Sequence, residues 1–282
     1  MIRTIVAGVV AAGAIIAVTA PARATSTPQP ALTGVREIAA PTAYSYGWRQ
    51  LADGTYSTCN PQAVLYGAPY RARNNAWLET RQCAASSGPH QITITSNAVP
   101  DAGLVVAYES VQDGEFYQWR DRASLFPKPV DRMRRGPYAH VACLGRGIPG
   151  GWQCDIDAYF HPSRASSSRH ASFEMVVVNR RGAPGGQLAS IGGVLYGWRS
   201  WMTCQRLASG ACDPAVRPWR IFYAVRIHHR SRVTVPVGAF AHFAVRHGLL
   251  PASAWLGDVA YGAELWSGGK GLRISMTIRH GR

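Results

Sequence analysis

The sequence predicts an all-β sandwich of two antiparallel sheets with a single α-helix. Twelve or more short runs rich in β-branched and aromatic residues are separated by Gly, Pro, Asn and Asp. Only residues 236–247 place apolar side chains at helical spacing, and we find no internal repeat. Many short strands with turn signals between them are typical of a two-sheet sandwich.

The first 24 residues predict a secretory signal peptide. Arg3 supplies the positive start, residues 5–18 form an apolar core, and Ala22-Arg23-Ala24 is a small-x-small cleavage site. The apolar core is too short to span a membrane, and no later apolar run is long enough. We therefore expect a secreted, extracellular protein without a membrane span.

Residues 25–55 are rich in Pro, Ala, Ser and Thr, and we expect a flexible lead-in that becomes ordered only near residues 44–48. Residues 56–282 are enough for one large all-β domain. The predicted strands, each bounded by turn residues, cover residues 64–66, 70–73, 91–95, 104–108, 139–143, 153–160, 172–179, 193–196, 220–227, 232–235, 256–264 and 271–278.

The predicted helix begins at about Pro236 and ends at about His247. Gly248 follows its last turn and Pro251 comes soon after, as expected at a helix end. A single amphipathic helix packs best on the outer face of a sheet. Its apolar side chains at helical spacing are Val237, Phe240, Ala241, Ala244 and Val245.

Six cysteines in an exported chain predict three disulfides. Their spacing favours sequential pairing of Cys59 with Cys83, Cys143 with Cys154, and Cys204 with Cys212, although the sequence alone allows fifteen connectivities. No Cys-x-x-Cys motif occurs, and an oxidising compartment favours disulfides over metal binding.

The chain carries a formal charge of +15, of which about +13 remains once Arg3 and Arg23 leave with the signal peptide. Lys128 and Lys270 are the only lysines. One interpretation is a solubilising arginine-rich surface, and another is electrostatic adsorption to an anionic envelope or extracellular polymer. We expect no nucleic-acid partner, because no nucleic-acid-binding motif is visible.

Three motifs that could carry chemistry lack the required context. Residues 145–150 match Gly-x-Gly-x-x-Gly, but Pro149 lies inside the match and no helix follows it. The nine histidines have no metal-ligand spacing, so we expect no metal. No Gly-x-Ser-x-Gly motif is present, so a serine hydrolase is unsupported.

A pair of glutamates is the strongest candidate site. Glu174 interrupts the apolar run 171–178, and Glu264 interrupts a similar run, 259–266. A carboxylate within an apolar strand is costly unless it is paired or faces a wet cleft. One interpretation is a pair of structural carboxylates bridged to arginines. Alternatively, two carboxylates could hydrolyse a glycoside, one attacking the sugar and the other protonating the leaving oxygen.

Several short motifs occur in a fixed order from Cys59 to the C-terminus. They are Cys59, Asn74-Asn75-Ala76-Trp77 and Cys83, then Ala107-Tyr108-Glu109-Ser110-Val111, Leu125-Phe126-Pro127, Asp157-Ala158-Tyr159-Phe160-His161-Pro162, Phe173-Glu174-Met175-Val176-Val177, His247-Gly248-Leu249-Leu250-Pro251-Ala252-Ser253 and Tyr261-Gly262-Ala263-Glu264-Leu265-Trp266. Over about 220 residues this series resembles the family 12 glycoside hydrolases, secreted endoglucanases and xyloglucanases.

The resemblance implies a β-jelly roll of the concanavalin A-like glucanase type, with one helix on the convex face. It further implies a retaining double displacement, with Glu174 as nucleophile and Glu264 as acid and base. Asp157 resembles the auxiliary carboxylate that hydrogen-bonds the nucleophile. Asn75, Trp77 and Trp266 are implied to contact the sugar, with Asn75 and Trp77 in a glycone-side subsite.

The chain also departs from the family pattern. Val178 stands where the family has a tryptophan four residues after the nucleophile, which removes an expected sugar platform. Leu78 replaces a usual glycine, Leu265 replaces the proline after the acid/base, and the loop from Cys204 to Cys212 is an insertion.

We expect a secreted retaining endo-β-glycanase that hydrolyses β-1,4-glucan-type polysaccharide and needs no cofactor. Two alternatives remain at this stage. One is a non-catalytic carbohydrate-binding protein on the same fold, and the other is a hydrolase of an anionic envelope or matrix glycan. We expect a monomer.

Overall fold

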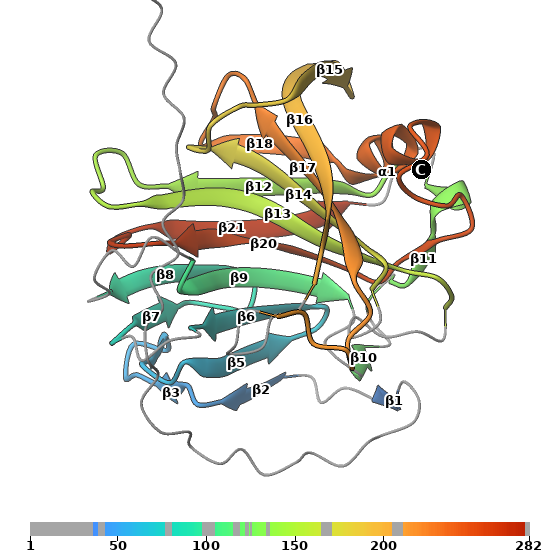
Figure 1. The fold of residues 1–282 in the computed structure, drawn as a ribbon. Helices are drawn as coiled ribbons and strands as arrows, with labels where there is room; N and C mark the ends of the chain where they lie inside the picture. The colour runs from blue at the N-terminus through green and yellow to red at the C-terminus, as the bar shows by residue number, and fades with distance from the viewer. Residues whose placement is uncertain are drawn as a thin grey trace, which may run out of the picture. The chain divides into compact units, whose positions relative to one another are not determined.

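The described residues of the chain fold into two large β-sheets and one α-helix (Figure 1). The computed structural model describes residues 36–38, 43–76, 81–97, 105–114, 119–121, 124, 126–133, 136–164, 171–204 and 211–279. The predicted signal peptide, residues 1–24, lies outside the described residues and stays a prediction.

The larger sheet has 12 strands, and the central ones carry the predicted carboxylates. In spatial order its main path is β15 (Gln187–Ile191), β16 (Val194–Thr203), β17 (Trp219–Arg226), β14 (Phe173–Arg180), β13 (Trp152–His161), β20 (Asp258–Leu265), β9 (Ala107–Gly114), β6 (Tyr70–Asn75), β5 (Gln62–Gly67) and β2 (Ala43–Tyr46). Off this path, β19 (Trp255–Leu256) pairs with β13 and with β11 (Lys128–Pro129).

The smaller sheet has seven strands. Its order is β18 (Arg232–Pro236), β12 (Tyr138–Leu144), β21 (Arg273–Arg279), β8 (Gln91–Ser96), β7 (Cys83–Ser86), β4 (Tyr56–Thr58) and β3 (Arg49–Gln50). A separate pair joins β1 (Arg36–Ile38) to β10 (Trp119–Asp121) in parallel.

The prediction of an all-β sandwich of antiparallel sheets is confirmed, with one local exception. Within the 12-stranded sheet, β14 and β17 run parallel, with Glu174 opposite Ile221. The chain leaves β14, forms the β15–β16 hairpin, and returns as β17 into the space between β16 and β14. Because β17 runs antiparallel to β16, it lies parallel to β14 on its other side.

The core lies between the two sheets because each sheet turns one row of apolar side chains toward the other. Alternation along a strand puts Ile156, Ala158 and Phe160 of β13 on the core side. From the smaller sheet, Ile92 and Ile274 belong to the same buried cluster. The opposite face of β13 is therefore left for its polar residues.

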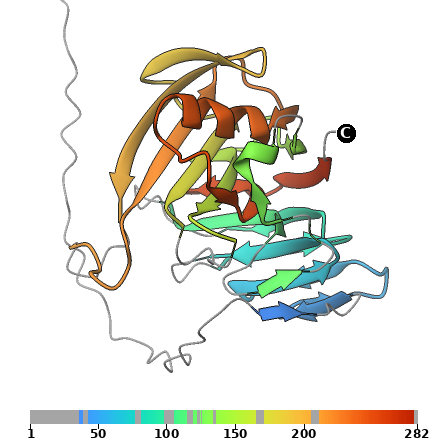
Figure 2. The same ribbon diagram turned by 90° about the vertical axis from the view of Figure 1, so that its right-hand side faces the viewer.

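The helix α1 (Val237–Arg246) is confirmed at nearly the predicted bounds. It lies beside β16 and β17 (Figure 2), where Phe240 packs against Tyr196 and Phe243 packs against Trp198, on the core-facing side of the larger sheet. Gly248, with φ +67°, ends the helix, and its N–H donates to the carbonyl of Val245.

A short 3-10 helix, η1, spans Val130–Arg132. Within the described residues, no helix has the length and apolarity needed to cross a membrane.

The three predicted disulfides are confirmed. They join Cys59 to Cys83, Cys143 to Cys154, and Cys204 to Cys212. The second bond links β12 of the smaller sheet to β13 of the larger one, so it ties the polar strand of the site to the opposite layer.

Three strands precede residue 56, where we expected the domain to begin, and two of them belong to the large sheets. β2 pairs with β5 of the larger sheet, and β3 pairs with β4 of the smaller one. Trp48, between them, is buried in the core. Residues 43–46 and 49–50 of the predicted lead-in are thus paired in the two sheets.

Glu109 is a charged residue type placed in the apolar core. It lies on β9 opposite Ala263 and is fully buried, and neither of its carboxyl oxygens has a hydrogen-bond partner among the described residues. Burial raises its pKa well above the usual value, so the group is held in its neutral form. A folded-state pKa above the unfolded one means that stability is lost as pH rises past the unfolded value.

We therefore expect the free energy of unfolding to fall less between pH 5 and pH 8 in Glu109→Gln than in the parent protein. Glu109→Met should in addition gain about 1–3 kcal/mol at neutral pH, since it removes an unpaired buried polar group of similar size. Urea unfolding at several pH values measures both effects. Parallel pH dependence in Glu109→Gln and the parent would contradict a buried neutral carboxyl.

Candidate active site

The site is built on one face of β13. Because side chains alternate along a strand, Gln153, Asp155, Asp157 and Tyr159 share the face turned away from the core. The neighbouring strands complete it: Glu174 of β14 is opposite Tyr159, and Glu264 of β20 is opposite Gln153. The fold thus brings Glu174, Glu264 and Asp157 to one sheet face.

Glu174 is held by neutral donors from two strands. The indole Nε1–H of Trp219, on β17, donates to its Oε2 at 2.5 Å. The hydroxyl of Tyr159 lies 3.3 Å from its Oε1 and 3.0 Å from Oδ2 of Asp157. Burial raises the pKa of Glu174, and hydrogen bonds involving Trp219, Asp157 and Tyr159 oppose that rise.

Glu264 is oriented by an amide. Nε2 of Gln153 donates to Oε2 of Glu264 at 2.6 Å and to Oδ2 of Asp155 at 2.9 Å. The hydroxyl of Tyr223 donates to Oε1 of Gln153 at 2.9 Å, which fixes which way the amide points. The pKa of Glu264 is raised to about 7. Burial is the largest cause, the charge of Glu174 adds to it, and the hydrogen bond from Gln153 opposes it.

The pKa values of the two aspartates of β13 are raised as well. Burial, followed by the charge of Glu174, raises the pKa of Asp157 well above its usual value. Burial and the charge of Glu264 do the same for Asp155. Several carboxyls on one desolvated face cannot all ionise together, so protons are shared among them.

Neither Glu174 nor Glu264 forms an ion pair with an arginine in the part of the chain that the structure describes. Both remain partly exposed. The alternative of two structural carboxylates bridged to arginines is therefore not supported. Among the described residues no group of three or more His, Cys, Asp or Glu side chains could hold a metal ion.

The expected sugar-contacting residues have different outcomes. Asn75 ends β6 on the same face, and its Oδ1 accepts a bond of 3.4 Å from Arg73. Trp266 follows β20 directly, two residues after Glu264, and its backbone N–H donates to Gly151. Trp77 lies outside the described residues, so its expected role stays a prediction.

Five residues of the site were not predicted from the sequence: Gln153, Asp155, Tyr159, Trp219 and Tyr223. Tyr159 could have been found, because it lies two positions after Asp157 and shares its face. Trp219 could not, since its contact depends on the parallel pairing of β17 with β14. Val178 is fully buried in a small apolar cluster beside these residues, together with Val176, Ile221, Tyr223 and Val225.

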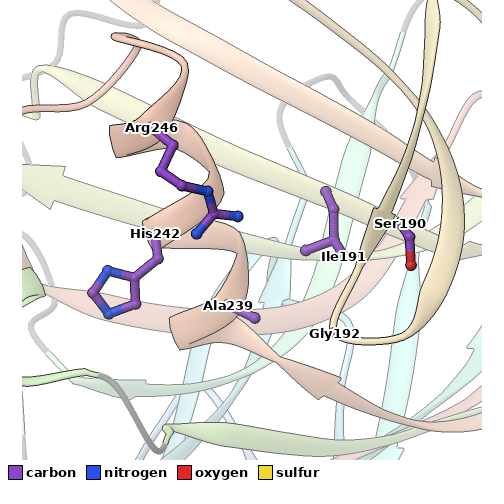
Figure 3. Close-up of a pocket in the computed structure, with 6 residues that line it drawn as sticks. All are labelled: Ser190, Ile191, Gly192, Ala239, His242 and Arg246. Carbon is purple, nitrogen blue, oxygen red and sulfur yellow. The ribbon is translucent and has the colours of Figure 1, made fainter.

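Two hollows lie elsewhere on the molecule. One, of about 400 Å³, lies between α1 and the β15–β16 turn, where Arg246 and His242 extend in different directions (Figure 3). It is lined by Ser190, Ile191, Gly192, Ala239, His242 and Arg246. The other, of about 670 Å³, is lined by Pro127, Lys128, Pro129, Asp131, Arg132, Arg164 and Trp255. Neither contains Glu174, Glu264 or Asp157, so chemistry and not pocket shape marks the site.

Comparison with solved structures gives strong matches of fold. A native family 12 xyloglucanase from Bacillus licheniformis superposes with a TM-score of 0.66 at 18% identity, covering 79% of this chain and 100% of that one. An endoglucanase from Rhodothermus marinus gives 0.62 at 23% identity, covering 85% and 99%. The chain has the family 12 glycoside hydrolase fold. A metagenome-derived family 12 endoglucanase gives 0.63 at 23% identity, covering 84% and 96%.

No protein-family model matches the sequence, and no curated protein matches it significantly. The predicted jelly roll with one helix is confirmed by the family 12 fold. At these identities the likeness speaks for the fold alone, and the chemistry has to be argued from the site itself.

Replacing Glu174 by Gln should lower the pKa of Glu264 below about 7, because a neighbouring negative charge that disfavours its ionisation is removed. Carboxyl ¹³C NMR titration of labelled glutamate measures this shift. Asp53→Asn, in an exposed turn, removes the same formal charge and should leave the Glu264 titration unchanged. An unshifted Glu264 in Glu174→Gln would mean that the two carboxyls do not interact.

Proposed function

We propose that this protein is a divergent family 12 glycoside hydrolase, a retaining endo-β-glycanase acting on β-1,4-glucan-type polysaccharide. The observation that carries the proposal is that Glu174 and Glu264 share one sheet face, that the charge of Glu174 raises the pKa of Glu264, and that neither pairs with an arginine of the described residues. The family 12 fold supports the same reading.

In the proposed mechanism Glu174 is the nucleophile and Glu264 the acid and base. Glu174 attacks the anomeric carbon while protonated Glu264 gives its proton to the leaving oxygen, which forms a glycosyl-enzyme ester. Glu264 then takes a proton from water, which attacks the same carbon and releases Glu174. A pKa of about 7 suits a group that must first give and then accept a proton.

The surrounding side chains prepare Glu174 for attack. Trp219 and Tyr159 direct N–H and O–H groups at its two oxygens, and such bonds favour the ionised carboxylate. Asp157, held protonated by burial, is the auxiliary carboxyl that shares a proton with the nucleophile. Asn75, Trp77 and Trp266 remain the proposed sugar contacts, without metal or organic cofactor in the reaction.

We expect Glu174→Gln and Glu264→Gln each to reduce release of reducing ends from a β-1,4-glucan by at least about a hundredfold, the scale of a lost acid, base or nucleophile. Asp53→Asn is the matched control and should keep its activity. Thermal unfolding must remain cooperative in every variant, so that a loss reports chemistry.

The stereochemistry of the product is a second readout of the same mechanism. Retention requires carboxyl groups about 5–5.5 Å apart, whereas a wider separation gives inversion. Proton NMR of the first-formed anomer decides between them. Near-parental turnover in either glutamine variant would remove the two-carboxylate mechanism, and binding without any product would favour a carbohydrate-binding protein, the alternative suggested by Val178.

We further propose that the protein is exported and adsorbs electrostatically to an anionic polymer. Three disulfides support export to an oxidising compartment. From residue 133 onward the sequence has nineteen Arg and Lys but only six acidic residues, five of them on β13, β14 and β20. The rest of this half of the chain is thus almost free of compensating negative charge.

Adsorption to an immobilised polyanion such as polygalacturonate should fall steeply between about 0.05 and 0.5 M salt, because exposed charges are screened over these concentrations. A pull-down series with neutral cellulose as the parallel matrix measures the effect. Adsorption that is indifferent to salt would count against an electrostatic partner.

A further inference from the structure

The polar sheet face continues beyond β14 over β17 and β16, where it carries an arginine stacked on two aromatic rings. The guanidinium carbon of Arg199 lies 5.2 Å from the ring centroid of Trp201 and 5.1 Å from that of Tyr223. The two rings are 6.0 Å apart at 49°. Stacking of this kind orients a guanidinium while leaving its N–H edge available.

The strand register places this group beside the carboxylates. Arg199 is opposite Tyr223, which is opposite Val176 of β14, and Val176 is opposite Asp157 of β13. Trp201 lies in the row of Ile221 and Glu174. Two strand spacings separate Trp201 from Glu174, about 10 Å between their backbones.

Arg199 is exposed and no carboxylate of the described residues accepts a hydrogen bond from it. Asp155 and Glu264 both accept hydrogen bonds from the side-chain amide of Gln153. Tyr223 donates to that same Gln153, so the stacked arginine is fixed relative to the catalytic carboxyl. The result is a preformed cation on the proposed glycan-facing side of the sheet, and no carboxylate of the described residues pairs with it.

We propose that Arg199 and Trp201 form a subsite for a sugar that carries a carboxylate, a uronic acid, close to the cleaved bond. The planar guanidinium fork matches a carboxylate in bidentate geometry. Trp201, 37% exposed, offers an aromatic surface to the sugar ring. The subsite lies across β14 from the expected glycone contact Asn75. This inference rests on the proposed function, since it assumes that this face binds the glycan.

The test compares two β-1,4-gluco-oligosaccharides of equal length, one neutral and one oxidised to carboxylate at C6. Binding is measured by calorimetry in a Glu174→Gln background, so that no substrate is consumed. We expect the acidic oligosaccharide to bind more tightly than the neutral one. Arg199→Gln should reduce this preference about tenfold, the scale of a hydrogen-bonded charged pair, and Arg199→Lys should restore only part of it.

Arg232→Gln is the matched control. Arg232 is equally exposed, but it lies on β18 of the other sheet. The Arg232→Gln substitution also removes one positive charge, so it reports the general attraction of an anion to a basic protein. We expect the preference for the acidic oligosaccharide to persist in this variant. Equal affinity for the two oligosaccharides, no binding of either, or equal losses in Arg199→Gln and Arg232→Gln would each overturn the subsite.

The failure of the subsite and the failure of the proposed function are separable. Hydrolysis of both oligosaccharides by the parent protein, with no preference in binding, would reject the subsite and leave the hydrolase standing. A tenfold Arg199-dependent preference without hydrolysis of either would support the subsite and reject the enzyme.

Discussion

The site depends on carboxyls that are largely withdrawn from water and that no cation of the described residues neutralises. Burial is the largest influence on Asp155, Asp157, Glu174 and Glu264, and it raises the pKa of each. An isolated buried carboxylate would be costly, and an arginine partner would make each one a permanently ionised structural group. Here indole, phenol and amide donors stabilise them instead, so that protons can still be exchanged among them.

This arrangement requires a rigid sheet beneath it. The same strands that present the carboxyls on one face bury Ile156, Phe160, Phe173 and Met175 on the other, with almost no exposure. Close-packed side chains of this kind resist small displacements. The disulfide between Cys143 and Cys154 adds a covalent link from β13 to the second sheet. Packing on one face thus fixes hydrogen-bond distances on the other.

Much of the fold could be predicted because its signals are local. Strand alternation, one amphipathic helix ended by Gly248, and short cysteine spacings all appear in consecutive residues. The glutamates could be found because a charged residue inside an apolar strand is conspicuous. Glu109 also interrupts an apolar strand, yet its side chain faces the core. The register of β9 with β20 shows the difference, because Glu109 lies opposite Ala263 whereas Glu264 lies opposite Tyr108.

The partners of the carboxyls could not be predicted in the same way. Trp219 reaches Glu174 because β17 is inserted between β16 and β14, and no local pattern encodes that insertion. Gln153 and Glu264 meet across β13 and β20, 111 positions apart in sequence. Such contacts are set by cross-strand register, which follows from the packing of the whole sheet.

The tryptophan missing at position 178 changes how the face can meet a sugar. Val178 is buried against Val225 within an apolar cluster, so no ring projects from β14 at that position. The aromatic groups on this side come from the next two strands instead: Trp219 is committed to Glu174, whereas Trp201 is exposed and stacked with Arg199. Under the proposed function, this aromatic surface lies two strands from β14 and beside a cation, so it would favour a different substituent on the glycan. The departures from the family pattern at Val178 on β14 and Leu265 on β20 leave Glu174 and Glu264 on one sheet face, beside Asp157 of β13.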